Sequence, residues 1–324
     1  MTESVLHPSP AAPATPGSYG LAPRGPALPD ATRLGPVALQ VADLARSVRF
    51  YETVLGLRVV SPDGARDGTP DAAPAMLAAA HDPTDRPLVV LHERPGARPA
   101  PARGRLGLYH FAILLPDRAS LGAFVRHAAA LGVSLGAGDH LVSEAFYLHD
   151  PDGLGIEVYA DRPRDAWRRR GRELLMATDP VDVPALLAAA GEAVWTGAPA
   201  GTVVGHVHLH VGDLDAAGAF YGDALGFTRM VWGYPGALFL GAGGYHHHLG
   251  TNVWAGAAAR PAGDDDARLL AWTIALPARA DVEAAAARVA AAGHRVAREG
   301  DDAFAVRDPW GTTVRVAVAD REER

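Results

Sequence analysis

Apolar and polar positions along the chain repeat at a fixed distance. The segments VADLARSVRFYETVLGL and VGDLDAAGAFYGDALGF begin at Val41 and Val211, 170 residues apart. In each copy the end of a predicted strand leads to an Asp, after which apolar residues recur at helical spacing as far as a Leu-Gly pair. Asp is typical of a helix N-cap and Gly of a helix end. Each copy therefore predicts a strand followed by a helix of about three turns.

A second, fainter pair of strand–helix units alternates with the first pair. GLYHFAILLPDRASLGAFVRHAAALGV and LLAWTIALPARADVEAAAARVAAAGHRV each predict a strand and an amphipathic helix, and each leads to an Asp-Pro-x-Gly turn, at Asp150 or Asp308. An alternating strand follows each turn. The pattern predicts an α+β fold of four tandem βαβββ modules. Their ranges are 34–95, 106–160, 203–256 and 268–319.

These modules predict two domains, 34–160 and 203–319, and any two such modules can curl their sheets into a cup. Residues 161–202 join the halves and contain RPRDAWRRRGRELL and PVDVPALLAAAGEA, both of which we expect to be helical. Residues 1–33 are rich in Pro and Ala and predict a flexible tail.

Composition narrows the classes of function. The net charge of -7 argues against a general nucleic-acid binder, and no apolar run reaches the roughly 20 residues that a membrane span needs. The N-terminus lacks the basic start and apolar core of a secretory signal, so we expect a cytoplasmic protein without a membrane partner. Because the chain contains 0 Cys, a metal would have to be held by His and carboxylate side chains.

The four modules and the motif VxDLxxSxxFYxxxLGL resemble the vicinal oxygen chelate superfamily, which includes glyoxalases, bleomycin-resistance proteins and extradiol dioxygenases. The resemblance covers nearly everything from Leu34 to Val318. It implies that metal ligands come from the first and last strands of each module. By itself it indicates a fold rather than a chemistry, because the superfamily hosts several reactions and some pure binders.

Those strand positions carry metal-binding side chains in the second and third modules. In the first strands they hold His110 and His206, where the first and fourth modules have Pro36 and Ala271. In the last strand of the second module they hold Glu157. Four of the 14 His lie in the second module and six in the third. The chemistry is therefore expected in these two modules.

His110, Glu157 and His206 would form a facial triad of two His and one carboxylate. Such a triad leaves open positions and suits non-heme Fe(II), with Mn(II) as the alternative metal. Its ligands come from the second and third modules, so we predict that these two share the metal-bearing cup and that the first module pairs with the fourth. His110 and His206 should then lie within about 5 Å of each other.

The segment from Gly138 to Glu157 resembles a pattern found in extradiol dioxygenases. It contains His140, an apolar-Tyr pair that ends at Tyr147, the turn Asp150–Gly153, and finally Glu157. The resemblance implies that Glu157 ligates iron, and that Tyr147 and His140 hydrogen-bond the substrate or oxygen intermediates as catalytic residues.

The resemblance also implies an acid–base His from the partner module. Successive side chains of a strand point to opposite faces, so only one of His247 and His248 can face the metal. Alignment with Glu157 favours His248 as the catalytic residue, with His247 as the alternative. His248 could instead be a fourth ligand, as in glyoxalase-type sites.

The likeness is greatest to catechol 2,3-dioxygenases. It implies extradiol cleavage of a catechol-type aromatic diol by Fe(II) and O₂, giving a 2-hydroxymuconic semialdehyde-type product, in a homo-oligomer. One alternative is another metal-dependent enzyme of the superfamily, such as a hydroquinone dioxygenase, an isomerase or a thiol transferase. The other is a metal-free resistance protein that binds a small molecule.

Overall fold

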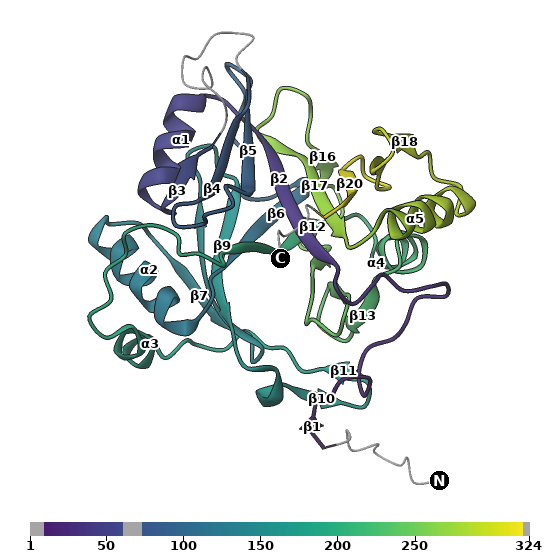
Figure 1. Cartoon of the computed structure of the whole chain (residues 1–324), viewed down its shortest axis with the longest axis horizontal. Coiled ribbons are helices and arrows are strands. Elements are labelled where there is room, and N and C mark those ends of the chain that lie inside the picture. Colours follow the sequence, from purple (N-terminus) through teal and green to yellow (C-terminus); the bar gives the residue numbers. More distant parts are fainter. Residues whose placement is uncertain (1–9, 61–72, 320–324) are drawn as a thin grey trace.

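The computed structural model describes residues 10–60 and 73–319, which form two large curved sheets and a small third one (Figure 1). The stretch 61–72 of the predicted first module lies outside the described residues. The nine-stranded sheet runs in the order β13 (Thr228–Val231), β14 (Ala237–Gly241), β15 (Leu249–Asn252), β12 (Val203–His210), β6 (Arg105–Leu114), β9 (Gly155–Asp161), β8 (Ser143–His149) and β7 (Gly136–Asp139), with β16 (Arg260–Pro261) beside β6. The eight-stranded sheet runs in the order β18 (Ala297–Arg298), β19 (Ala303–Arg307), β20 (Thr313–Val318), β17 (Arg268–Leu276), β2 (Arg33–Val41), β5 (Pro87–Glu93), β4 (Ala75–Ala79) and β3 (Leu57–Val59).

The order of the strands shows which modules pair. Antiparallel pairing of β6 with β12 joins the second and third modules, and antiparallel pairing of β17 with β2 joins the fourth and first. The prediction that the second module pairs with the third, and the first with the fourth, is confirmed. Each half of the chain, 34–160 and 203–319, therefore contributes one module to each sheet.

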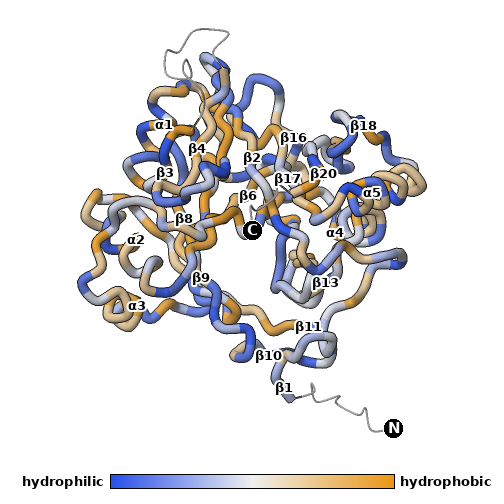
Figure 2. Tube along the Cα trace, in the orientation of Figure 1, coloured by the Kyte–Doolittle hydropathy of each residue, from blue (hydrophilic) through white to orange (hydrophobic). Residues whose placement is uncertain are grey.

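Helices follow the first strand of every module. They are α1 (Leu44–Thr53), α2 (Arg118–Ala130), α4 (Leu214–Ala217) continued by the π-helix η2 (Gly218–Ala224), and α5 (Arg279–Ala291). The carboxylates of Asp43, Asp117 and Asp213 each accept a hydrogen bond from the backbone N–H three residues later, so the N-caps predicted at Asp43 and Asp213 are confirmed. α1 contacts β3 and β5, and α2 contacts β9, while β4 includes a hydrophobic stretch (Figure 2). No helix in the described ranges is long and apolar enough to cross a membrane.

The connector between the halves differs from the two predicted helices. Its second part is helical, as α3 (Val183–Ala190). RPRDAWRRRGRELL instead forms the 3₁₀ turn η1 (Arg164–Ala166) and the hairpin of β10 (Arg168–Arg170) and β11 (Glu173–Leu174). Gly171 has a φ of 61° in the two-residue turn, a conformation that suits a tight hairpin and that a helix does not contain. The prediction of a helix here is wrong.

The predicted flexible tail is also wrong for residues 10–32, which pack against the rest of the protein. β1 (Ala12–Pro13) pairs with β10, Leu28 is buried in the main core, and the Tyr19 hydroxyl donates to the carbonyl of Gly244 at 2.8 Å. The composition of this segment suggested disorder because Pro and Ala dominate it. Its few large apolar residues, such as Tyr19 and Leu28, nevertheless pack against the rest of the protein. Residues 1–9 of the predicted tail lie outside the described residues.

Two buried tyrosine–aspartate contacts connect the sheets at equivalent places. The hydroxyl of Tyr51, on α1, donates to Asp150 at 3.2 Å, and that of Tyr221, on η2, donates to Asp308 at 2.7 Å. In each contact the Tyr comes from the Phe-Tyr motif of one sheet and the Asp from the Asp-Pro-x-Gly turn of the other. The two motifs of the repeat therefore meet each other, and we call these contacts the Tyr–Asp links.

We expect Asp150→Asn to make stability less dependent on pH. Burial raises the pKa of Asp150 from 3.8 to about 6, so the folded protein binds this proton more readily than the unfolded chain. The carboxyl therefore favours folding below about pH 4 and loses that contribution as pH rises through about 6. Asn keeps an oxygen for the backbone N–H groups of Asp152 and Leu154 but carries no charge.

Urea unfolding of the wild type and Asp150→Asn at pH 4 and pH 7 measures the effect. The difference in unfolding free energy should shift in favour of the variant by up to about 3 kcal/mol between the two pH values. Asp308→Asn is the equivalent variant in the other Tyr–Asp link. Its unfolding free energy should change with pH in the same direction, because burial also raises the pKa of Asp308. Equal pH dependence in the wild type and both variants would contradict this account.

Candidate metal centre

Three side chains of metal-ligand type converge on one face of the nine-stranded sheet. Nε2 of His110 and Nε2 of His206 lie 2.9 and 3.1 Å from Oε2 of Glu157. The ligand atoms of all three lie within 4.8 Å of one another. The three come from the adjacent strands β6, β9 and β12, in which both Glu157 and His206 pair with Ala112. The single methyl group of Ala112 leaves room for the three longer side chains to meet.

The protonation states of Glu157 and His110 suit the binding of a metal cation. Burial alone would raise the pKa of Glu157, but His206 and His110 outweigh burial and hold the pKa well below its usual range. Burial lowers the pKa of His110, despite the opposing effect of Glu157. A carboxylate and a neutral imidazole are the forms that bind metals.

Unpartnered nitrogen atoms provide an independent test of whether a metal fits. His110 Nε2 is buried and, although near Glu157, does not make a hydrogen bond with it; Nδ1 of His206 is buried without a partner as well. Buried polar atoms in proteins are normally satisfied, so an orphaned imidazole nitrogen facing a carboxylate requires an explanation. A divalent cation between His110, Glu157 and His206 would satisfy the first of these atoms, and the residues present therefore fit a metal.

His140 and Tyr147 lie together beside this group. The Tyr147 hydroxyl is 2.6 Å from Nε2 of His140, and Nδ1 of His140 is 2.7 Å from the carbonyl oxygen of Ala177. A ring nitrogen can hydrogen-bond to a carbonyl oxygen only if it carries a proton, so Nδ1 is the protonated nitrogen of His140 and Nε2 accepts from the tyrosine hydroxyl. Tyr147 pairs with Glu157 across β8 and β9, and its ring centroid is 5.4 Å from that of His110. Burial raises the pKa of Tyr147 well above its usual range, so the hydroxyl stays protonated.

The structure brings His247, rather than His248, to this group. The ring centroid of His247 is 4.2 Å from that of His206. The His248 ring instead packs 4.9 Å from the ring of Tyr245, and its Nδ1 accepts a hydrogen bond from the backbone N–H of Ala242 at 3.2 Å. As predicted, the two neighbouring side chains diverge, but the alignment with Glu157 selected the wrong one of the pair to lie beside His206.

The strand register explains the difference. Glu157 pairs with Ala112, two residues after His110, and the matching position two residues after His206 is His208, which pairs with Gly250. Gly250, not His248, is therefore the counterpart of Glu157. A Cβ atom at Gly250 would lie 2.9 Å from the His208 ring, so His208 occupies the space that a ligand side chain would need there.

A chain of hydrogen-bonding groups lies behind His247. Oδ1 of Asp161 is 2.9 Å from Nε2 of His246, and Nδ1 of His246 is 2.7 Å from Nδ1 of His247. If His246 donates to the carboxylate through Nε2, its Nδ1 accepts from Nδ1–H of His247, and Nε2 of His247 is then without a proton. Burial, followed by the neighbouring His206 and His246, holds the pKa of His247 well below its usual range, so the ring is neutral. Asp161 and His246 were not among the residues predicted from the sequence, although the run of three His and the acid at the end of β9 were available as a signal.

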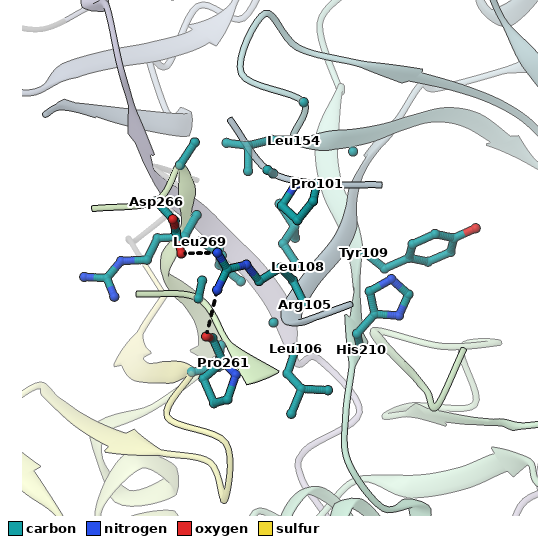
Figure 3. Close-up of a pocket in the computed structure, with 18 of the residues that line it drawn as sticks. Pro101, Arg105, Leu106, Leu108, Tyr109, Leu154, His210, Pro261, Asp266 and Leu269 are labelled. Atoms are coloured by element: carbon teal, nitrogen blue, oxygen red, sulfur yellow. Dashed lines mark hydrogen bonds and ion pairs between the residues drawn. The ribbon is translucent and has the colours of Figure 1, made fainter. Parts of the chain in front are cut away.

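Tyr109 links the group to a neighbouring cavity. The Tyr109 ring centroid lies 4.9 Å from that of His110 and 4.7 Å from that of His210. Tyr109 and His210 also line a cavity of about 120 Å³ (Figure 3). Much of its remaining wall is apolar, from side chains including Pro101, Leu106, Leu108, Leu154, Pro261 and Leu269. Arg105 points at the carboxylate of Asp266 at 2.9 Å, so these two charges in the cavity are paired.

Comparison with known proteins gives consistent matches. A profile of the Glyoxalase/Bleomycin resistance protein/Dioxygenase superfamily matches residues 33–158 and 203–316. A catechol-2,3-dioxygenase of Bacillus subtilis (strain 168) is 44% identical over 282 residues, which are 86% of this chain and 94% of the relative. A solved structure of a candidate dioxygenase from Bacillus subtilis subsp. subtilis str. 168 has a TM-score of 0.59 at 15% identity, over 89% of this chain and 86% of that one. Glyoxalase I from Zea mays has a TM-score of 0.53 at 18% identity, over 89% and 92% of the two chains. These two structures share the fold.

Proposed function

The chain belongs to the Glyoxalase/Bleomycin resistance protein/Dioxygenase superfamily, and from that premise we propose that it is an extradiol ring-cleaving dioxygenase. Its substrates would be a catechol-type aromatic diol and O₂, and its product would be of the 2-hydroxymuconic semialdehyde type. One observation carries the proposal: His110, Glu157 and His206 converge in a chain that is 44% identical to a catechol-2,3-dioxygenase. The homo-oligomer and the cytoplasmic location stay predictions.

His110, Glu157 and His206 would hold the metal, which we propose to be Fe(II), with Mn(II) as the alternative. Two imidazoles and one carboxylate leave about half of an octahedral metal's positions free for other ligands. Bound ferrous iron would supply those open positions and a path by which electrons pass from the catechol to O₂. The strands keep the three ligand side chains in place, which a loop would do less well.

His247 would act as the acid–base residue. The chain of Asp161, His246 and His247 favours a bare Nε2 on His247, and such a nitrogen can take a proton from a catechol hydroxyl. Tyr147, positioned by His140, would offer its hydroxyl to an oxygen atom of the substrate or of O₂. Tyr109, at the boundary with the cavity of Figure 3, would provide an aromatic surface for the substrate ring.

The test is oxygen consumption by reconstituted protein. The purified chain is loaded with Fe(II) without oxygen, desalted, and mixed with catechol or with hydroquinone in air-saturated buffer. We expect oxygen uptake and a yellow product with catechol, and much less of both with hydroquinone. Uptake with hydroquinone alone would favour a hydroquinone dioxygenase. Isomerisation of a thiol adduct without oxygen uptake would favour a glyoxalase-type enzyme. No reaction and no bound metal would favour a binding protein and would overturn the proposal.

A further inference from the structure

A second cavity lies near the start of β2, β5 and β12, away from the metal ligands. It has a volume of about 180 Å³. Its residues come from both large sheets, from the segment before β2, from the connector and from the loop before β15, and include Leu34, Arg86, Leu88, Arg164, Val203 and His248. Tyr245 lies between this cavity and the metal centre, because its hydroxyl meets that of Tyr159 at 2.7 Å and the Tyr159 ring packs 4.9 Å from the ring of His206.

Positive charge predominates in this cavity. Three arginines line it, Arg33, Arg86 and Arg164, against a single carboxylate, that of Asp30. The cavity of Figure 3 is also lined by three arginines and one carboxylate, but there Arg105 pairs with Asp266 at 2.9 Å and Arg268 pairs with Asp264 at 2.8 Å. A cavity with more cations than anions attracts an anionic ligand.

Two of the three guanidinium groups have donors to spare. Arg164 donates through Nη1 to the carbonyl of Gly243 at 3.1 Å, and no carboxylate in the described part of the chain pairs with it. The Arg86 side chain is 36% exposed, and the carboxylate of Asp82 lies 3.9 Å from its Nη2, beyond hydrogen-bond distance. Guanidinium donors without a carboxylate partner could each give a ligand carboxylate a charge-assisted hydrogen bond.

His248 adds a neutral donor to the same wall. Its Nδ1 accepts from the backbone N–H of Ala242, so its proton resides on Nε2, for which the described residues offer no acceptor. The side chain is buried, and burial lowers its pKa to about 3, so it remains neutral at physiological pH. The residue that sequence alignment placed at the metal thus faces a different cavity.

We propose that this cavity binds a small organic monocarboxylate with a single ring or a short acyl chain. Arg86, Arg164 and His248 would hold the carboxylate. Leu34, Leu88 and Val203 would surround the apolar part. An engineered apolar cavity of about 150 Å³ holds benzene, so a cavity of this size takes a one-ring body. The site involves none of the proposed metal ligands and does not depend on the proposed reaction.

The test is calorimetric titration of benzoate into the full chain after the metal has been removed with a chelator. We expect one molecule of benzoate to bind per chain, and benzamide, which has the same shape without the charge, to bind at least about tenfold more weakly. Arg86→Gln and Arg164→Gln should each weaken benzoate binding about tenfold or more, and Arg164→Lys less than Arg164→Gln. Glu157→Gln should leave benzoate binding unchanged, which separates this cavity from the metal centre.

Three results would overturn the proposal. They are no benzoate binding by the folded wild type at millimolar concentration, equal affinity for benzoate and benzamide, and unchanged affinity in both arginine-to-glutamine variants. Circular dichroism checks that each variant is folded. Because two arginines on different elements are tested, loss of folding in one variant still leaves the other to decide. The titration needs no metal, so its outcome is independent of whether the dioxygenase proposal holds.

Discussion

Glu157→Gln should yield a folded protein that neither retains iron nor consumes oxygen with catechol. Gln has nearly the same size as Glu, but it brings no negative charge, and its NH₂ group would compete for the nitrogens of His110 and His206. Removing the only carboxylate of the triad should weaken Fe(II) binding by more than the roughly 10–100-fold that loss of an outer-shell partner costs. Metal content after desalting, and oxygen uptake at saturating catechol, measure the two effects.

Glu144→Gln is the matched control for this experiment. Glu144 is also a buried glutamate of the same sheet, on β8, but its carboxylate is held by Arg118 at 2.5 and 3.0 Å. Its loss should cost stability, because Arg118 loses its partner, without changing the iron content of the folded protein. If Glu157→Gln kept the wild-type iron content, the assignment of the triad would fail.

His247→Ala should lower kcat by about 10²–10⁴-fold, which is the usual contribution of a general acid–base residue, while iron remains bound. We expect this loss because His247 lies beside His206, at the end of the hydrogen-bonded chain that begins at Asp161. His248→Ala should change kcat far less, since its ring packs against Tyr245 and lines the second cavity, that of about 180 Å³. Steady-state oxygen uptake, with iron content determined on the same samples, compares the two variants.

The comparison also separates the alternatives for these two histidines. Loss of iron in His247→Ala would make this residue a fourth ligand rather than a base. A large fall in kcat in His248→Ala, with His247→Ala close to the wild type, would return the acid–base role to His248. Because the two residues are adjacent and both buried, non-specific damage to the fold should affect the variants similarly.

The sequence predicted the arrangement of modules because its evidence is periodic. The repeat that begins at Val41 and Val211 specifies strand, cap and helix in the same order twice, and Asp43 and Asp213 form the expected caps. The pairing of modules could be predicted as well, because ligand-type residues in the second and third modules can share a metal only if those modules meet. The motif around Tyr147 rests on spacing within one hairpin, and the structure brings Tyr147 and His140 into hydrogen-bond contact.

The register of β15 could not be predicted in the same way. The run at 246–248 contains three consecutive His, and which of them faces the metal centre depends on the residue of β12 opposite each one. That pairing is fixed by a partner strand about 40 residues earlier and by where the loop after β14 ends, not by local pattern. The β10–β11 hairpin was missed for a related reason: its pairing with β1 involves a segment more than 150 residues away.

The Tyr–Asp links and the crossed pairing of modules give the chain the connectivity of a domain-swapped dimer fused into one polypeptide. Residues 34–160 contain half of each sheet, and residues 203–319 contain the other halves. A copy of the second half paired with itself would lack the carboxylate of the triad, because Glu157 lies in the first half and its counterpart in the second half is Gly250. Fusion therefore allows the halves to differ, with one cup kept for chemistry and the other free to diverge. Both halves are also needed for the triad. Cutting the chain within the connector would place His110 and Glu157 on one fragment and His206 on the other.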